Sequence, residues 1–320
     1  MKDKMIWSYF LELSLHIGAD ENTVQSAWYL PPRYTECNNA DIEVWDETVK
    51  FIAERKFNAC VIDVGDAVQY ESHPEISAPD AWSKDFLKSK LEQMRALGIE
   101  PLPKLNFSMC HTTWLKEYRR RVSTPEFYRV CSDLIAEVCE VFGSPRLFHL
   151  GMDEETAWDQ SARGICIVRG EKLWWHDLFF LFSECEKHGA RPWVWADYYW
   201  THPDLFEKNM PKSVLQSNWQ YESFRDYDDT FGYKRMPRIN AYERLDKLGY
   251  DQVPGCSTWY TNTNPYETLA HGKAKLSKEK LKGYLTIPWA YGINRETEYS
   301  LKNDAHRLYV ARQKLYPETL

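Results

Sequence analysis

The sequence predicts an α/β fold, a single (β/α)8 TIM barrel that spans residues 1–320. Two observations favour this fold. Eight short apolar runs recur along the chain, and a helical pattern follows each of them with no Gly/Ser-rich linker in between. A doubly wound open sheet is the alternative, but the segment 19–22 after the first run reads Ala-Asp-Glu-Asn and is not a glycine-rich phosphate loop.

The apolar runs and the helical stripes between them give the expected elements in order. The predicted strands are 10–16, 59–64, 100–106, 147–151, 192–196, 214–219, 255–260 and 284–289. The predicted helices are 44–55, 81–98, 125–143, 171–187, 203–210, 240–248, 265–280 and 301–315. The third helix has clear boundaries, because Thr124 is a capping residue, Pro125 suits the first helical position and Gly143 ends the apolar stripe.

Composition excludes several classes of protein. The formal charge of −7 leaves no basic surplus for the phosphates of a nucleic acid. No apolar run is long enough to span a bilayer and residues 1–8 do not resemble a signal peptide, so we expect a cytoplasmic protein with no membrane contact. The eight cysteines are scattered and lack metal-ligand spacing, so we expect reduced thiols, no cofactor and no metal.

The fourth predicted strand ends in the most informative stretch of the chain. The apolar run 147–150 meets Gly151, and Asp153, Glu154 and Glu155 follow. Burial opposes the charge of carboxylates at a strand end, so a cluster there is a candidate for chemistry. The alternative is that the three acids open a helix, where negative charge is favoured.

Polar and aromatic residues follow the other predicted strands as well. In a barrel, the loops after the C-terminal strand ends carry the functional residues. Those loops here hold acids, amides and aromatic rings with few cations: Asp63, Asp66, Glu71, Asn106, His111, His149, Asp153, Glu154, Asp197, Trp219, Tyr260, Asn262, Trp289 and Tyr291. Carboxylates and amides bind hydroxyls, and rings stack on sugars, so the set predicts a site for a neutral polyhydroxylated ligand.

Single members of this set also have structural explanations. Trp219 and Trp289 fit the barrel core, and Asp63 fits a loop brace. His149 lies within a strand pattern, where a hydrogen-bonded core histidine is the common case. The functional prediction therefore depends on the strand ends taken together.

The first connection, residues 18–40, is long and carries Trp28, Tyr29 and Tyr34. We expect this loop to form a wall or lid of the cleft, or a contact between the subunits of a homodimer. Both roles suit large aromatic rings, which bury much apolar surface on contact.

The motifs at these strand ends resemble those of glycoside hydrolase family 20, the β-N-acetylhexosaminidases. The most specific is the segment 149–154, His-Leu-Gly-Met-Asp-Glu, which is similar to the family's His-x-Gly-x-Asp-Glu signature. The resemblance runs from about Val44 to Trp289 and also includes the segments 51–58, 66–76, 98–111, 193–197, 217–219 and 260–262.

The resemblance implies an exo-acting, retaining hydrolase in which the 2-acetamido oxygen of the substrate is the nucleophile, through an oxazolinium intermediate. Glu154 is then the general acid and base, and Asp153 orients the acetamido group. Repulsion between the two carboxylates is expected to keep Glu154 protonated near neutral pH. The expected ligand is an N-acetylhexosamine-containing glycan, and the candidate binding residues are Tyr260, Trp195, Trp219, Trp289, Asp197, Asp66, His111, Tyr291 and Asn262.

Within this resemblance, single residues take separate roles. Tyr260 is expected to bind the acetamido carbonyl, and the three tryptophans to enclose its methyl group and the sugar ring. His111, together with Asp66, is expected to tune the two carboxylates.

The sequence departs from the family where specificity is set. The stretch 7–12 has no counterpart of the family's sugar-gripping arginine, Tyr291 replaces a glutamate, and Asn106 stands where an aspartate is usual. These groups hold hydroxyls 3, 4 and 6 in the family, so the terminal sugar is expected to be GalNAc or GlcNAc. The family's small domain before the barrel also has no counterpart, so we expect a barrel-only relative whose uncovered surface favours a homodimer.

Two other functions fit parts of the sequence. A catalytically silent N-acetylhexosamine-binding barrel is favoured by the missing arginine and glutamate. A metal-dependent hydrolase would use residues such as His111, His149 and Asp153 together with Asp197, but no His-x-His or similar ligand spacing supports it.

Overall fold

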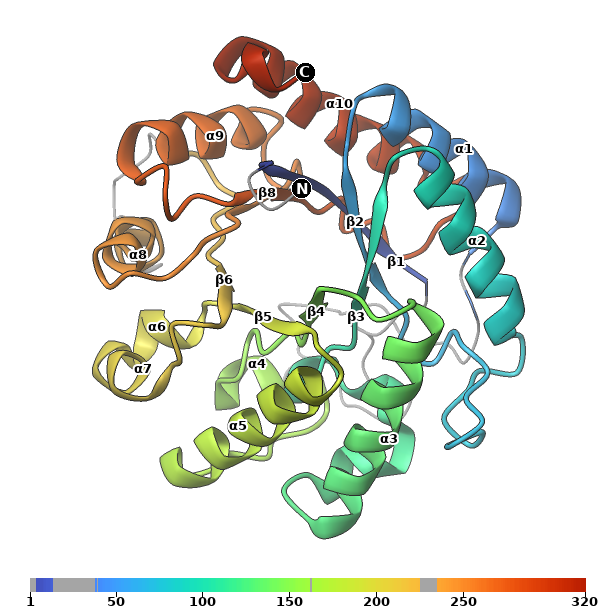
Figure 1. Cartoon of the computed structure of the whole chain (residues 1–320). Coiled ribbons are helices and arrows are strands. Elements are labelled where there is room, and N and C mark those ends of the chain that lie inside the picture. The colour runs from blue at the N-terminus through green and yellow to red at the C-terminus, as the bar shows by residue number, and fades with distance from the viewer. Residues whose placement is uncertain (1–3, 14–37, 39, 162, 225–234) are drawn as a thin grey trace.

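The computed structural model describes residues 4–13, 38, 40–161, 163–224 and 235–320, which form a barrel of eight parallel strands (Figure 1). The strands are β1 (Ile6–Glu12), β2 (Ala59–Asp63), β3 (Glu100–Lys104), β4 (Leu147–His149), β5 (Arg191–Trp195), β6 (Leu215–Ser217), β7 (Gly255–Cys256) and β8 (Gly283–Thr286). They pair in the order β6-β5-β4-β3-β2-β1-β8-β7. Parallel bridges from Gln216 to Gln252 and from Trp219 to Gly255 join the two edges. The predicted α/β barrel is confirmed.

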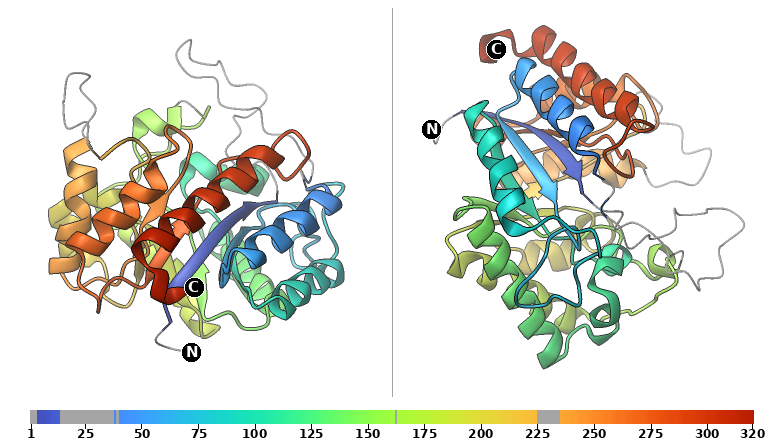
Figure 2. Two further views of the ribbon diagram at one scale, coloured as in Figure 1. Left: turned by 90° about the horizontal axis from the view of Figure 1, so that it is seen from above. Right: turned by 90° about the vertical axis from the view of Figure 1, so that its right-hand side faces the viewer.

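Helices surround the barrel on its outside (Figure 1). The α-helices of the described residues are α1 (Ile42–Glu54), α2 (Lys84–Ala96), α3 (Pro125–Val141), α4 (Ala157–Ser161), α5 (Glu171–Lys187), α6 (Tyr198–Thr201), α7 (Pro203–Asn209), α8 (Arg235–Lys247), α9 (Asn264–Lys275) and α10 (Glu298–Leu315). Short 3-10 helices are η1 (Met109–His111), η2 (Thr113–Arg121) and η3 (Pro317–Thr319). Side views show α1, α2 and α10 lying alongside β1 and β2 (Figure 2).

Side chains on alternate strand positions fill the barrel. The interior cluster includes Ile6 and Phe10 of β1, Val61 of β2, Leu102 of β3 and Trp193 of β5. Residues on the other face of the strands join a larger cluster beneath the helices. Because both faces are buried, the strands appear in the sequence as continuous apolar runs, and this is why seven of them were predicted close to their observed positions.

The first strand was predicted too far along the chain. β1 covers Ile6–Glu12 instead of residues 10–16, with Ile6 paired to Gly283 of β8 and Ser8 paired to Ala59 of β2. All of β1 is buried, including the polar residue Ser8. Ser8 interrupts the apolar run in the sequence, and the start of the strand was therefore missed. The aromatic loop predicted at 18–40 falls almost entirely outside the described residues.

Capping explains where the third predicted helix begins. The side chain of Thr124 accepts a hydrogen bond from the backbone N–H of Phe127, and Pro125 is the first residue of α3. The helix ends at Val141, and Gly143 follows with a φ of +69°. The predicted boundaries of this helix are confirmed.

The remaining structural expectations concern cysteines, metals and membranes. Within the described part of the chain the cysteines are free thiols, and all are buried except Cys166. No helix there combines the length and apolarity needed to cross a bilayer. Nor does that part hold a group of three or more His, Cys, Asp and Glu residues arranged around a metal.

Candidate active site

The loop after β4 has an unusual backbone. Gly151, Met152 and Glu154 have φ angles of +74°, +73° and +54°, in the left-handed region that non-glycine residues rarely occupy. Glycine is also required for space, because a Cβ at Gly151 would lie 1.8 Å from Oδ1 of Asn106. Such strain persists only where surrounding contacts hold it, and here those contacts fix the directions of Asp153 and Glu154.

Asp153 is buried and held as an anion. Its Oδ1 accepts a hydrogen bond from Nδ2 of Asn106 at 2.9 Å, and its Oδ2 lies 3.1 Å from Nε2 of His111. Its backbone carbonyl accepts a hydrogen bond from Ser108. Burial alone would raise the pKa of the Asp153 carboxyl, but His111, Lys104 and Asn106 outweigh it and lower the pKa well below the usual range.

Glu154 lies beside two cations. Its side chain is 32% exposed, and its Oε2 lies 3.3 Å from Nε2 of His111 and 3.5 Å from Nη2 of Arg163. Burial raises the pKa of Glu154, but the close approach and charge of His111 and the charge of Arg163 lower it below its ordinary value. The expectation that Asp153 keeps Glu154 protonated was therefore wrong for this structure, because the cations outweigh the repulsion between the two acids.

His111 joins the two carboxylates. It ends η1 in the loop after β3 and is buried. Burial lowers the pKa of His111, yet Asp153 and Glu154 raise it from 6.5 to about 9. His111 is therefore an imidazolium at neutral pH, shared by both acids.

The charge of His111 predicts a loss of stability in alkali. Its pKa is about 9 in the folded protein against 6.5 ordinarily, so its contribution is complete below pH 6.5 and is lost as the pH rises through 9. This shift corresponds to at most about 3 kcal/mol of unfolding free energy. The test is the free energy of unfolding in urea, measured below pH 6.5 and above pH 9 for the wild type and for His111→Gln. An equal fall in both proteins would contradict the assignment.

Asp197 and an aromatic wall lie next to the two acids. Oδ2 of Asp197 accepts a hydrogen bond from the backbone N–H of Glu154 at 3.2 Å, and Oδ1 accepts one from Nε1 of Trp219 at 2.6 Å. The Trp219 ring stacks on Tyr221 at 4.8 Å, and Tyr221 meets Trp289 edge-on at 6.3 Å. These three rings, the aromatic wall, come from the ends of β6 and β8.

Three other predicted residues lie farther out at the same end of the barrel. Tyr260 follows β7 and is 67% exposed. Asn262 accepts a hydrogen bond from Asn303 of α10 at 2.9 Å. Tyr291 follows β8, has a φ of +53° and meets Trp259 edge-on at 5.6 Å. A sugar contact for these rim residues stays a prediction.

Two predicted residues lie deeper. Trp195 ends β5 in the interior cluster, and its ring lies 4.7 Å from that of His149. Asp66 is fully buried in the loop after β2. Burial, followed by the charge of Asp66, raises the pKa of Tyr70 in that loop. Contact of Trp195 or Asp66 with a ligand stays a prediction.

The histidines do not suit a metal centre. Nδ1 of His149 accepts a hydrogen bond from the backbone N–H of Gly151 at 3.0 Å, and its ring packs against Trp193 and Trp195. Burial, followed by the charge of Lys104, lowers the pKa of His149 well below its ordinary value, as expected of a neutral core histidine. A metal needs a neutral imidazole, whereas His111 is protonated. The chemistry of this donor set disfavours the metal-dependent alternative.

The chain superposes on solved structures of family 20 enzymes. It matches the chitobiase of Flavobacterium johnsoniae with a TM-score of 0.61 and 15% identity, over 94% of this chain and 50% of that chain. It matches the β-N-acetylhexosaminidase of Streptomyces coelicolor A3(2) with a TM-score of 0.62 and 11% identity, over 95% of this chain and 64% of that chain. The fold is that of the family 20 barrel.

A third family 20 structure, the exo β-N-acetylglucosaminidase of Vibrio harveyi in complex with N-acetylglucosamine, matches with a TM-score of 0.61 and 13% identity, over 99% of this chain and 57% of that chain. The chain thus spans 50% to 64% of the length of these three structures. No protein-family model matches the sequence, and no curated protein matches it. At such low identity the likeness shows the fold alone.

Two cations near the acids of this family 20-like barrel were missed in the sequence. Arg163 follows α4 and reaches Glu154. Lys104 of β3 forms an ion pair with Asp63 of β2, and both side chains are 2% exposed. Arg163 lies beyond a helix, so a search of strand ends could not find it, whereas Lys104 is the last residue of β3 and lay inside the predicted strand 100–106. The ion pair of Lys104 links two neighbouring strands, so Asp63 braces the sheet here instead of the loop that was expected.

Glu155 is an anchor. Its Oε1 accepts a hydrogen bond from the backbone N–H of Met109 at 2.9 Å, and its Oε2 pairs with Arg169 at 2.8 Å. Arg169 in turn pairs with Asp177 of α5 at 3.0 Å. The alternative that the three acids open a helix was wrong, because the residue that caps α4 is Thr156, whose Oγ1 accepts a hydrogen bond from the backbone N–H of Asp159.

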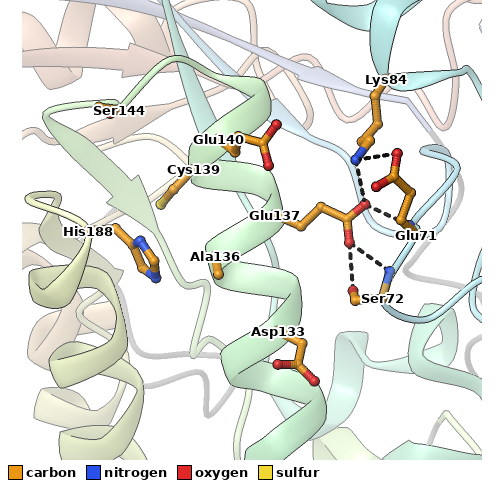
Figure 3. A pocket seen from close by; sticks show the side chains of 10 residues that line it. All are labelled: Glu71, Ser72, Lys84, Asp133, Ala136, Glu137, Cys139, Glu140, Ser144 and His188. Atoms are coloured by element: carbon orange, nitrogen blue, oxygen red, sulfur yellow. Dashed lines mark hydrogen bonds and ion pairs between the residues drawn. The ribbon is translucent and has the colours of Figure 1, made fainter.

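A surface cavity of about 570 Å³ lies outside the barrel, against α3. Neither Asp153 nor Glu154 lines it. Figure 3 shows Glu137 of α3 directed toward Lys84, Glu71 and Ser72. Glu137 accepts hydrogen bonds from the backbone N–H groups of Glu71 and Ser72 at 2.7 and 3.1 Å, and it lies 3.3 Å from Lys84. These contacts brace the loop before α2.

Proposed function

We propose that the protein is an exo-acting, retaining β-N-acetylhexosaminidase that removes a terminal GlcNAc or GalNAc with the help of the substrate's own acetamido group. The observation that carries the proposal is the Asp153–His111–Glu154 cluster at the C-terminal end of the barrel. Two carboxylates lie 3.1 and 3.3 Å from one imidazolium. In such a cluster one carboxylate can transfer a proton while the other balances a positive charge. The fold likeness supports the broader assignment as a glycoside hydrolase.

The proposed reaction forms a five-membered oxazolinium ring on the sugar and then opens it. The acetamido oxygen of the substrate attacks the anomeric carbon while the glycosidic bond breaks, which gives an oxazolinium ion. Asp153, an anion held by Asn106 and His111, would accept the acetamido N–H and balance the positive charge. Water then attacks the anomeric carbon and restores the acetamido group, and Glu154 takes the proton that the water loses.

Glu154 needs a proton before the first step. His111 carries a proton at neutral pH because its pKa is raised to about 9, and its Nε2 is 3.3 Å from Oε2 of Glu154. A sugar that covers the partly exposed Glu154 removes water from it, and desolvation raises the pKa of a carboxyl group. His111 would then pass its proton to Glu154, which donates it to the leaving oxygen.

The aromatic wall would stack on the sugar ring. Trp219 and Trp289 are half-buried, and the buried ring of Tyr221 lies between them. The apolar face of a sugar packs well on a partly exposed indole. Under this proposal the rim residues Tyr260, Asn262 and Tyr291 would meet the acetamido group and hydroxyls, and the deeper Trp195 and Asp66 would close the base of the site.

A catalytically silent N-acetylhexosamine-binding barrel is the second candidate function. The lowered pKa of Glu154 favours it, because a carboxyl that stays ionised cannot donate a proton. Under this reading the cluster would bind the acetamido group without cleaving the glycoside.

A panel of aryl glycosides distinguishes the two functions. The substrates are β-GlcNAc, β-GalNAc, β-glucoside and β-galactoside, and Glu154→Gln is the control. We expect release from the N-acetylhexosaminides alone and inhibition by a thiazoline mimic of the intermediate. Calorimetric binding of GlcNAc or GalNAc without release over days would support the silent barrel. Equal cleavage of glycosides that lack the acetamido group would contradict substrate assistance.

The homodimer stays a prediction. It rests on the aromatic composition of residues 18–40. Sedimentation at micromolar concentration measures it, and a monomer there would contradict it.

A further inference from the structure

Asp197 lies at the junction of two loops of the site. It follows β5 directly and is 8% exposed. Its Oδ2 accepts the backbone N–H of Glu154, and its Oδ1 accepts the indole N–H of Trp219. One side chain thus contacts both the loop of the acid and the aromatic wall.

Both partners need this contact. Glu154 has a φ of +54°, and such a conformation costs a non-glycine residue about 1–2 kcal/mol. The hydrogen bond to its N–H helps to hold that conformation. The Trp219 ring lies 4.8 Å from both Trp200 and Tyr221 and 5.0 Å from the guanidinium of Arg238, and the bond to its Nε1 fixes the orientation of the ring among them.

Asp197 also differs from its neighbours in charge. Burial, followed by the charges of Asp153 and Glu154, raises the pKa of Asp197 well above its ordinary value, although the hydrogen bonds from Trp219 and Glu154 oppose this. The raised pKa means that a third negative charge beside Asp153 and Glu154 is disfavoured. The two hydrogen bonds of Asp197 tie its side chain to the backbone of Glu154 and to the indole of Trp219, as expected of a support.

We propose that Asp197 is a positioning residue that couples the place of the acid Glu154 to the place of the sugar-stacking indole of Trp219. The inference rests on the proposed function. A sugar seated against Trp219 meets Glu154 at a fixed place, because one buried side chain holds both. Asp197 thus acts through these two residues instead of binding the sugar.

Two substitutions of Asp197 test the coupling. Asparagine keeps one oxygen acceptor and leucine keeps none. We expect kcat on an aryl β-N-acetylhexosaminide to fall about tenfold in Asp197→Asn and at least about a hundredfold in Asp197→Leu, with KM within about twofold in the first. A raised KM with near-normal kcat in both variants, as for a lost sugar ligand, would overturn the proposal.

The control is Tyr199→Phe on α6, the helix that Asp197 directly precedes. Tyr199 donates a hydrogen bond to Glu207 at 3.1 Å, away from the acids. Both kinetic constants should stay within about twofold of the wild type, since the loss of one such bond costs little. A fall like that of the Asp197 variants would show general damage to α6 and overturn the proposal.

A readout without turnover separates this proposal from the proposed function. The indole N–H resonance of Trp219, identified by its loss in Trp219→Phe, should exchange slowly in the wild type and in Asp197→Asn. It should exchange at least about tenfold faster in Asp197→Leu. An unchanged exchange rate of the Trp219 indole N–H in Asp197→Leu would contradict the coupling, even if the enzyme is active. If the wild type releases no aryl group, the proposed function fails, and the exchange still decides whether Asp197 holds Trp219.

Discussion

Replacing Glu154 by glutamine should lower kcat on an aryl β-N-acetylhexosaminide by about a thousandfold, because the variant cannot donate a proton to the leaving oxygen. Asp153→Asn should cost about 10²–10³-fold, since it removes the charge that balances the oxazolinium ion. Both variants should keep the fold, as measured by thermal melting. Glu92→Gln, at an exposed acid of α2, is the matched control and should behave like the wild type.

The leaving group separates the two roles. A phenol of low pKa needs little help from an acid, so its glycoside should recover much of the activity of Glu154→Gln. The same substrate should not restore the activity of Asp153→Asn, because that variant has lost the charge that stabilises the oxazolinium ion of the sugar. Full activity of Glu154→Gln on a poor leaving group would remove Glu154 from the reaction.

Gly151→Ala should destabilise the protein by about 3–5 kcal/mol and abolish activity, as a sum of overpacking and left-handed strain. Its Cβ would lie 1.8 Å from Oδ1 and 2.9 Å from Cα of Asn106, so backbone must move. Asn106 also donates to Asp153, so the displacement reaches the acid. Urea unfolding and the aryl glycoside assay measure the two effects.

Gly189→Ala is the control for backbone strain. Gly189 has a φ of +76°, close to that of Gly151, but nothing lies within 4 Å of its added Cβ. This variant should lose only about 1–2 kcal/mol and keep its activity. Similar losses in both variants would mean that the approach of Asn106 to Gly151 does not matter.

The barrel could be predicted because burial leaves a direct mark on the sequence. Strands buried on both faces appear as apolar runs, and Gly151 with its three acids stands out at the end of β4. β1 was placed too late because Ser8 interrupts the run, while the pairing of Ile6 with Gly283 lies almost a chain length away. Such long-range pairing is not visible in a local pattern.

The charge state of the site could not be predicted from adjacent residues. Asp153 and Glu154 are neighbours in sequence, which suggested repulsion and a protonated acid. The fold brings His111 from the loop after β3 and Arg163 from beyond α4, and these cations reverse the shift. Glu155 looked equivalent to its neighbours until Arg169 showed it to be an anchor.

The central claim is that the acetamido oxygen of the substrate attacks the anomeric carbon between Asp153 and Glu154. The most direct measurement is kcat/KM for aryl β-GlcNAc substrates whose acetamido methyl carries zero to three fluorines. Each fluorine withdraws electrons from the amide oxygen and weakens it as a nucleophile. We expect a steady fall in kcat/KM, on the order of several-fold for each fluorine. A kcat/KM independent of fluorine number would contradict it.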